Sequence, residues 1–258
     1  MATDTESPVL TERRGGVLLI TLNRPDARNS VNRALAEGVA AALDELDADA
    51  ELRVGVLTGA GKGFCAGMDL KAFVAGESAW VDGRGFAGIV QRSSRKPLIA
   101  AVEGFAVAGG LEIALACDVL VVAKGAKLGI PEVKRSLVAA GGALLRLPQR
   151  VPYGIAMELA LTGDPITAER GYELGLVNRL AEPGGAVDAA IELAGAISKN
   201  APLALMATKE VLEKQRGWTD AEFWDEQAKI TGPVFISNDA REGSVAFAEK
   251  REPVWTGT

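Results

Sequence analysis

Histidine is missing from this chain of 258 residues, and its absence narrows the chemistry that the protein can perform. Ser-His-Asp and Cys-His nucleophile activation both need an imidazole, and histidine is the commonest transition-metal ligand. Acid–base chemistry therefore falls to Glu, Asp, Lys, Tyr or Cys. The two cysteines, Cys65 and Cys117, are too few for a disulfide framework or a cysteine zinc site. We expect both to be reduced and no metal to be bound.

Long apolar runs and an excess of basic residues are also absent. No apolar run approaches the roughly twenty residues that a membrane-spanning helix needs, and the polar, acidic segment 1–14 lacks the regions of a signal peptide. A net charge of −6 and a pI near 5.0 argue against a nucleic-acid-binding surface. We therefore expect a cytoplasmic globular protein without a membrane or nucleic-acid partner, and its 48% hydrophobic content suffices for a sizeable core.

Strands and helices alternate in the first two thirds of the chain. Short apolar runs predict strands at 9–13, 16–23, 54–57, 97–102, 119–122 and 176–180. Ser30 is the expected N-cap of a helix whose apolar stripe runs from Val31 to Leu46. This order predicts an α/β fold that begins with a β-β-α unit. Between 72 and 95 only irregular or short helical structure is expected, with Trp80 and Phe86 as anchors.

The C-terminal part reads as mainly helical and is rich in aromatic residues. Helices are expected at 141–147, 153–162, 168–174, 202–215 and 239–251, and a T-x-x-E capping box at 219–222 starts another. Six of the thirteen aromatic residues lie between Trp218 and Trp255. One small lobe cannot bury so many large apolar groups, so we expect a subunit contact there. We divide the chain into a core at 1–200 and a C-terminal helical oligomerisation region at 201–258.

The stretch VEGFAVAGGLEIALACD at 102–118 places an acid, Glu112, inside an apolar run that opens on Gly109 and Gly110. Residues 110–117 read as a helix, and a glycine pair at its start leaves N–H donors free at the positive end of the dipole. Such donors suit a polarised or negatively charged oxygen, as in an oxyanion hole. A buried carboxylate must be compensated, and perturbed acids in clefts are often functional.

Simpler interpretations compete with these. A lone glycine pair is most often a tight strand-to-helix turn. Glu132 follows Pro131, which suits the first position of a helix, so this acid alone is most simply one that complements the helix dipole. The loop at 59–67 carries four glycines but contains an apolar tripeptide at 64–66, which indicates that it folds inwards.

Several ordered motifs together resemble the crotonase family of enoyl-CoA hydratases and isomerases. They are LNRPDARNSV at 22–31, GKGFCAGMDLKAF at 61–73, KPLIAAVEGFAVAGGLEIALACD at 96–118, KLGIPEVK at 127–134 and FAEKREP at 247–253. This resemblance implies a spiral of β-β-α units with C-terminal helices that form trimers, commonly paired into hexamers. It also implies an acyl-CoA thioester as substrate, with coenzyme A entering as part of that substrate and no further cofactor.

The resemblance implies roles for individual residues. The backbone N–H groups of Met68 and Gly109 match the oxyanion-hole donors that grip the thioester oxygen. Glu112 and Glu132 match the two acids that hold the water in family hydratases. We assign Glu112 as the base and Glu132 as the donor of the C2 proton, and the reverse assignment stays open.

Other matched positions concern coenzyme A. Asp69, Leu70 and Lys71 match contacts to the thioester arm, Ala27 and Asn29 lie where the family's loop contacts the adenine, and Lys250 matches a basic residue near the phosphates that another subunit can supply. Taken alone, Lys250 is most simply a solvated charge on a terminal helix.

Two departures from the family pattern bear on function. The motif is AGG at 108–110 where many hydratases have GGG, and the donor at Gly109 is expected to be intact. The segment 134–147 lacks the proline-containing loop common in straight-chain hydratases, which leaves acyl chain length and shape open. The leading interpretation is a 2-enoyl-CoA hydratase. Alternatives are double-bond isomerisation, dehydration of a carnitinyl-type thioester, or an RNA-binding or non-catalytic family member.

Overall fold

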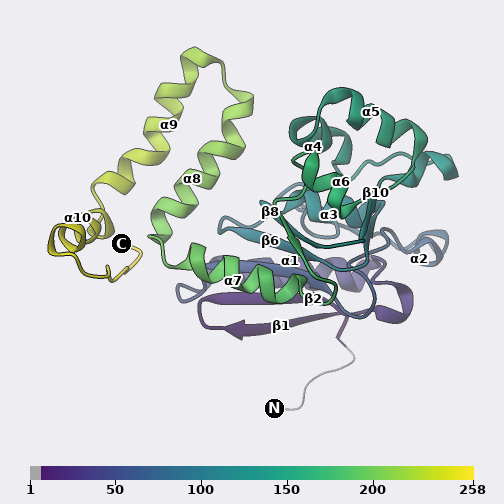
Figure 1. Cartoon of the computed structure of the whole chain (residues 1–258), viewed down its shortest axis with the longest axis horizontal. Helices are drawn as coiled ribbons and strands as arrows, with labels where there is room; N and C mark the ends of the chain where they lie inside the picture. Colours follow the sequence, from purple (N-terminus) through teal and green to yellow (C-terminus); the bar gives the residue numbers. More distant parts are fainter. Residues whose placement is uncertain (1–6) are drawn as a thin grey trace.

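The computed structural model describes residues 7–258, and its main element is a six-stranded sheet (Figure 1). The strand order is β1-β2-β3-β6-β8-β11; β1 runs antiparallel to β2, and every other neighbouring pair is parallel. The strands are β1 Val9–Arg14, β2 Val17–Leu22, β3 Val54–Gly59, β6 Leu98–Val102, β8 Val119–Ala123 and β11 Arg179–Ala181. Five of the expected strands are confirmed, and the sixth, expected at 176–180, begins three residues later, at Arg179. The first residues of the polar segment 1–14 lie outside the described residues.

Helices cover both faces of this sheet because successive side chains of its strands point to opposite cores. Leu18 and Ile20 of β2 belong to the core beneath α1 (Arg33–Ala48). Leu19, between them, belongs to the core beneath α7 (Ala186–Ser198). The sheet is therefore the central layer of the fold.

The start of α1 differs from the expectation. Its N-cap is Asn32, whose side chain accepts the N–H of Leu35 at 3.1 Å, so the assignment of Ser30 was wrong. Val31 precedes the helix and pairs with Met68 in an isolated parallel bridge. Helix α7 was not predicted, because its buried positions are alanines, which give a weak apolar pattern.

A second, smaller sheet has the order β10-β9-β7, from the strands β7 Phe105–Val107, β9 Lys127–Gly129 and β10 Ile166–Thr167. The chain passes from β6 in the large sheet to β7 in the small one, and again from β8 to β9. Helix α3 (Gly109–Ala116) follows β7, so β6-β7-α3 repeats the strand-strand-helix order of β1-β2-α1. The expected α/β spiral of β-β-α units is confirmed.

The remaining core elements surround these sheets. They are α2 Leu70–Val74, β4 Trp80–Val81, β5 Gly85–Phe86, the 3-10 helix η2 Pro131–Arg135, α4 Ala143–Arg150, α5 Tyr153–Thr162 and α6 Ala168–Glu173. Phe86 is buried as expected, but Trp80 remains 43% exposed and packs its ring on Phe86 with centroids 5.1 Å apart.

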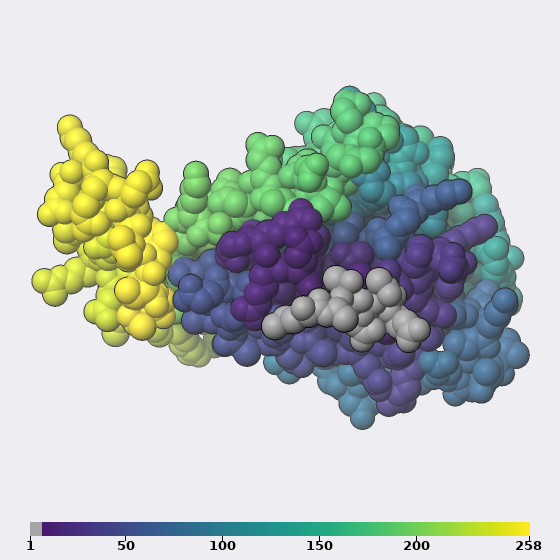
Figure 2. Space-filling view, turned by 90° about the horizontal axis from the view of Figure 1, so that it is seen from below, coloured from purple at the N-terminus to yellow at the C-terminus, as the bar shows by residue number. Residues whose placement is uncertain are grey.

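Three C-terminal helices form an arm that extends from the core (Figures 1 and 2). They are α8 Pro202–Lys214, α9 Asp220–Phe235 and α10 Asn238–Glu249, and the capping box of Thr219 and Glu222 starts α9 as expected. Helix α9 has no buried residue, and Trp224, Phe235 and Phe247 are largely exposed. In the part of the chain that the structure describes, no helix is long and apolar enough to cross a membrane.

Candidate active site

The start of α3 fixes the direction of the Gly109 amide. The carbonyl oxygen of Ala108 accepts the N–H groups of Leu111 at 2.9 Å and of Glu112 at 3.2 Å, inside the helix. Because the peptide between Ala108 and Gly109 is trans, its N–H points the opposite way from this carbonyl, out of the helix. Ala108 has φ 53° and ψ −133°, a backbone conformation that residues other than glycine rarely adopt. The structure thus maintains a strained residue directly before the amide.

The second glycine-rich segment lies against this point. A Cβ placed on Gly67 would be 2.9 Å from the Gly109 nitrogen and 2.8 Å from the Ala108 methyl group. This close approach requires glycine, which Gly67 also needs for its φ of +95°. Met68, the next residue, therefore lies beside Gly109. Among residues 7–258, the amide N–H groups of Met68 and Gly109 form no hydrogen bond.

The loop at 59–67 folds inwards, as predicted. Phe64 and Cys65 are fully buried, and the Val107 N–H donates to the Cys65 carbonyl at 3.1 Å. This hydrogen bond attaches the loop to β7, the strand that leads into α3. Cys65 and Cys117 are free, and burial raises the pKa of each thiol to about 12.

Glu112 lies in the first turn of α3 and is only 4% exposed. Its Oε1 accepts the N–H of Ala143 at 3.1 Å. The pKa of this carboxyl group is raised to about 7, by burial first and by the charge of Glu132 second, against the opposing effects of the amides of Ala143 and Gly141 and the guanidinium of Arg146. A carboxyl group with this pKa exchanges protons at neutral pH.

Glu132 is half-buried at the start of η2, directly after Pro131. Burial raises the pKa of its carboxyl group. Its Oε2 is buried and has no hydrogen-bond partner among the described residues. Complementing a helix dipole does not explain a buried, unpaired oxygen next to a second acid, because such acids normally face solvent. The charge of Glu132 contributes to the raised pKa of Glu112, so the structure places the two acids within electrostatic reach of each other.

Two polar residues expected at the coenzyme A loop hold the loop itself. Asn29 is fully buried; its Oδ1 accepts the Arg24 N–H at 2.9 Å, and its Nδ2 donates to the carbonyls of Ala60 at 2.8 Å and Gly63 at 2.9 Å. Asp69 caps α2 and pairs with Arg24 at 3.0 Å, which together with the capping amides lowers the pKa of its carboxyl group. Both side chains are thus occupied within the chain.

The other predicted coenzyme A positions are divided between two places. Ala27 is half-buried in the 3-10 helix η1 (Pro25–Ala27), and Leu70 and Lys71 are exposed on α2, near the pairing of Val31 with Met68. Lys250 is exposed at the end of α10, which lies at the opposite end of the molecule from α2 (Figure 1). One chain therefore does not bring Lys250 to the acids.

Sequence reasoning missed some residues at the site. Arg24 links the loop at 24–30 to Asp69, and the segment from Gly141 to Ala143 supplies the Ala143 N–H that donates to Glu112. The pair Gly141-Gly142 before a helix was the available signal, because it matches the pattern that drew attention to Gly109-Gly110.

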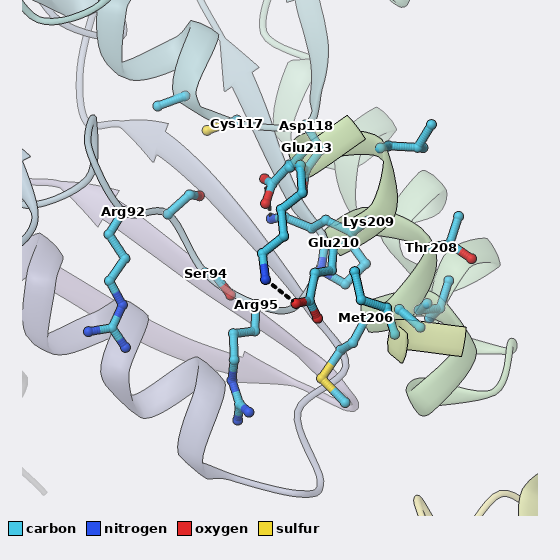
Figure 3. A pocket seen from close by; sticks show the side chains of 18 of the residues that line it. Arg92, Ser94, Arg95, Cys117, Asp118, Met206, Thr208, Lys209, Glu210 and Glu213 are labelled. Atoms are coloured by element: carbon cyan, nitrogen blue, oxygen red, sulfur yellow. Dashed lines mark hydrogen bonds and ion pairs between the residues drawn. The ribbon is translucent and has the colours of Figure 1, made fainter. Parts of the chain in front are cut away.

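A cavity of about 1370 Å³ lies elsewhere, between the arm and the core (Figure 3). Its wall contains Cys117 and Asp118, just beyond the C-terminal end of α3, and Lys209 of α8, which pairs with Asp118 at 2.8 Å. Neither Glu112 nor Glu132 lines it. This cavity is therefore separate from the candidate active site.

The sequence matches the family model described as enoyl-CoA hydratase/isomerase over residues 12–258. The chain belongs to the enoyl-CoA hydratase/isomerase family. Enoyl-CoA hydratase EchA19 of Mycobacterium tuberculosis is 43% identical, with 98% of each chain covered. Carnitinyl-CoA dehydratase of Salmonella arizonae is 40% identical, covering 98% of this chain and 99% of the relative. A crystal structure of an enoyl-CoA hydratase from Mycobacterium tuberculosis has a TM-score of 0.96 and 60% identity, covering 98% and 100% of the two chains.

Membership of the enoyl-CoA hydratase/isomerase family confirms the resemblance seen in the sequence, and with it the fold and the nature of the protein as an enzyme. The similar proteins carry names for both hydration and dehydration of coenzyme A thioesters.

Proposed function

We propose that this enzyme is a 2-enoyl-CoA hydratase, which adds water across the 2,3 double bond of an enoyl-CoA thioester. The observation that carries the proposal is the placement of two acids, buried Glu112 and half-buried Glu132, where the charge of Glu132 acts on the pKa of Glu112. Two unpaired amides accompany them, that of Gly109 at the start of the helix that holds Glu112 and that of Met68 beside it. The coenzyme A moiety belongs to the substrate, and the reaction requires no further cofactor.

The first step uses the amides of Met68 and Gly109. Both donate to the thioester oxygen, which withdraws electrons from the conjugated C3 and stabilises the enolate that forms when water attacks. Preorganised backbone donors are effective here because they do not reorient during the reaction.

The acids move the two protons of the reaction. Ionised Glu112 accepts a proton from water while the water oxygen bonds to C3, and protonated Glu132 delivers a proton to C2. One O–H bond of water and the O–H bond of Glu132 break, while the C3–O bond, the C2–H bond and an O–H bond on Glu112 form, so the product is the 3-hydroxyacyl thioester. Release of the proton from Glu112 to solvent and uptake of one by Glu132 restore the starting state. The pKa of Glu112, about 7, lets this carboxyl group take up or release a proton at neutral pH, and burial raises the pKa of Glu132 as well. The reverse assignment, with Glu132 as the base and Glu112 as the acid, uses the same chemistry.

A panel of enoyl-CoA thioesters, short, long, branched and steroid-like, tests this proposal through loss of the conjugation absorbance and product identification. Glu112→Gln and Glu132→Gln should each lower kcat by about a hundredfold or more, because both acids take part in the proton transfers. Their losses should not add, because the acids act as a unit. Near-wild-type turnover in either variant would remove that residue from the mechanism.

Dehydration of a carnitinyl-type thioester is the second candidate, favoured by the carnitinyl-CoA dehydratase relative. It is the reverse reaction on a cationic 3-hydroxyacyl chain, and the same donors and acids serve it. Adding carnitinyl-CoA to the panel separates the two candidates, because a hydratase for uncharged chains will react more slowly with it. Isomerisation needs only one acid, so the presence of a second acid argues against it.

We further propose a homotrimer, or a hexamer of two trimers, in a cytoplasmic setting, with the arm at 201–258 as the contact. Exposed Trp224, Phe235 and Phe247 support this, because aromatic groups of this size are normally covered. A neighbour can then supply Lys250 to the phosphates. Lys250→Ala should raise the KM of full coenzyme A thioesters more than that of pantetheine thioesters, with unchanged light scattering. Equal rises for both substrates would refute this role.

A further inference from the structure

The carboxylate of Glu112 lies directly against the backbone of Gly141. A Cβ placed on Gly141 would be 2.5 Å from Oε2, 2.8 Å from Cδ and 3.2 Å from Oε1 of Glu112. No other group lies among the three nearest atoms. The carboxylate of Glu112 thus occupies the space that a side chain at position 141 would need.

Gly141 also belongs to the segment whose amides favour the charged form of Glu112. The Ala143 N–H donates to Oε1 at 3.1 Å, and the amide of Gly141 also lowers the pKa of the carboxyl group. Both residues are buried, so water does not replace these donors when the segment moves. The placement of the carboxylate therefore depends on how closely residues 141–143 approach it.

Conformational freedom does not explain a glycine at 141. Gly142 is the residue of the pair with a positive φ, +104°, and it forms the N-cap of α4. Gly141 has no such φ, and its requirement is for space alone. Ordinary van der Waals contact begins at 3.4 Å, so a methyl group would displace the carboxylate or the loop by about 1 Å.

We propose that Gly141 is a positioning residue for Glu112, which sets the place of the carboxylate by its lack of a side chain. The inference rests on the proposed hydratase function, in which Glu112 receives the proton of water. A misplacement of about 1 Å is enough to lower a rate by about a hundredfold.

Gly141→Ala tests this in the full-length protein. With crotonyl-CoA, or the panel member that reacts fastest, kcat should fall by about a hundredfold while KM changes less than about threefold. The acidic limb of the kcat profile should move up by about one pH unit, because the displaced carboxylate loses amide donors that favour its charged form. Unchanged kcat and pH profile would overturn the proposal.

Gly154→Ala is the matched control. Gly154 lies in the first turn of α5, has no positive φ, and has no atom within 4 Å of the position its Cβ would take. It should retain the activity and pH profile of the wild type. Equal losses in both variants would mean that any added methyl group disturbs the enzyme, which would refute a specific role for Gly141.

Shortening the acid provides a rescue test. Glu112→Asp removes one methylene group and leaves room for the methyl group of Gly141→Ala. The double variant should therefore be no slower than Glu112→Asp alone, because the clash has gone. Multiplicative losses in the double variant would show that the two residues act independently, against the proposal.

A readout without substrate separates this inference from the proposed function. Gly141→Ala should extend the fall of the free energy of unfolding with pH beyond pH 7, by about one further pH unit, because ionising Glu112 becomes harder. In a Glu112→Gln background it should leave the pH dependence unchanged. If the wild type hydrates no thioester but this difference is found, the hydratase proposal fails and the positioning of Glu112 stands. If the wild type is active and no difference is found, the positioning inference fails.

Discussion

Replacing Glu112 by glutamine should make the protein more stable at neutral and alkaline pH. Burial raises the pKa of Glu112 from 4.5 to about 7, so folding disfavours the ionised form. The contribution of protonated Glu112 to the free energy of unfolding is therefore fully present below pH 4.5. It is lost as the pH rises to about 7, because the unfolded chain releases this proton at lower pH than the folded protein does. One pKa unit corresponds to about 1.4 kcal/mol, which gives a loss on the order of 3 kcal/mol.

Glutamine has nearly the same shape, still accepts the Ala143 N–H, and carries no charge at any pH. Urea unfolding of wild type and Glu112→Gln at one protein concentration and several pH values between 4.5 and 9 measures the difference. The curves should diverge with rising pH, the variant becoming more stable while its activity is lost. Glu51→Gln, at an exposed acid before β3, is the control and should follow the wild type.

Parallel pH dependences in wild type and Glu112→Gln would refute the reasoning. They would mean that the folded protein ionises Glu112 as easily as the unfolded chain does. The amides of Ala143 and Gly141 would then have outweighed burial, and Glu112 would be a fully ionised base at all working pH values.

Two further predictions concern the proposed oxyanion hole. Gly109→Pro should abolish activity more completely than Met68→Ala, because proline deletes an N–H and alanine keeps it; equal losses with circular dichroism and oligomer size unchanged would contradict backbone donation. Ala108→Gly should raise the free energy of unfolding by about 1 kcal/mol, because relief of a strained φ of 53° exceeds the entropy cost of glycine. A lower midpoint in thermal unfolding would show that the Ala108 methyl group stabilises the fold by packing instead.

Local patterns were reliable where the physical cause is local. The capping box of Thr219 and Glu222, the strand runs and the apolar stripe of α1 depend on near neighbours in the chain, and the structure contains them. The prediction of Ser30 as the N-cap of α1 was wrong because Ser30 and Asn32 both suit a cap. Val31 pairs with Met68 outside the helix, which begins only at Arg33.

The sequence by itself also determined which chemistry is available. It has no imidazole, and it places Glu112 in an apolar helix after two glycines and Glu132 after Pro131, so a pair of acids and a set of backbone amides could be proposed from it. The family resemblance then connected them. These groups lie far apart in the sequence, so the residues alone do not show that the groups lie near one another in the fold.

Only the tertiary structure decided how these groups meet. The approach of Gly67 to Gly109, the contact of Gly141 with Glu112 and the buried, unpaired oxygen of Glu132 join segments far apart in sequence. The tertiary structure also shows that the side chains of Asn29 and Asp69 form hydrogen bonds or ion pairs within their own loop region. Lys250 lies at the opposite end of the molecule from α2. Such contacts depend on packing between distant segments, and a pKa near 7 for Glu112 arises from that burial rather than from its neighbours in sequence.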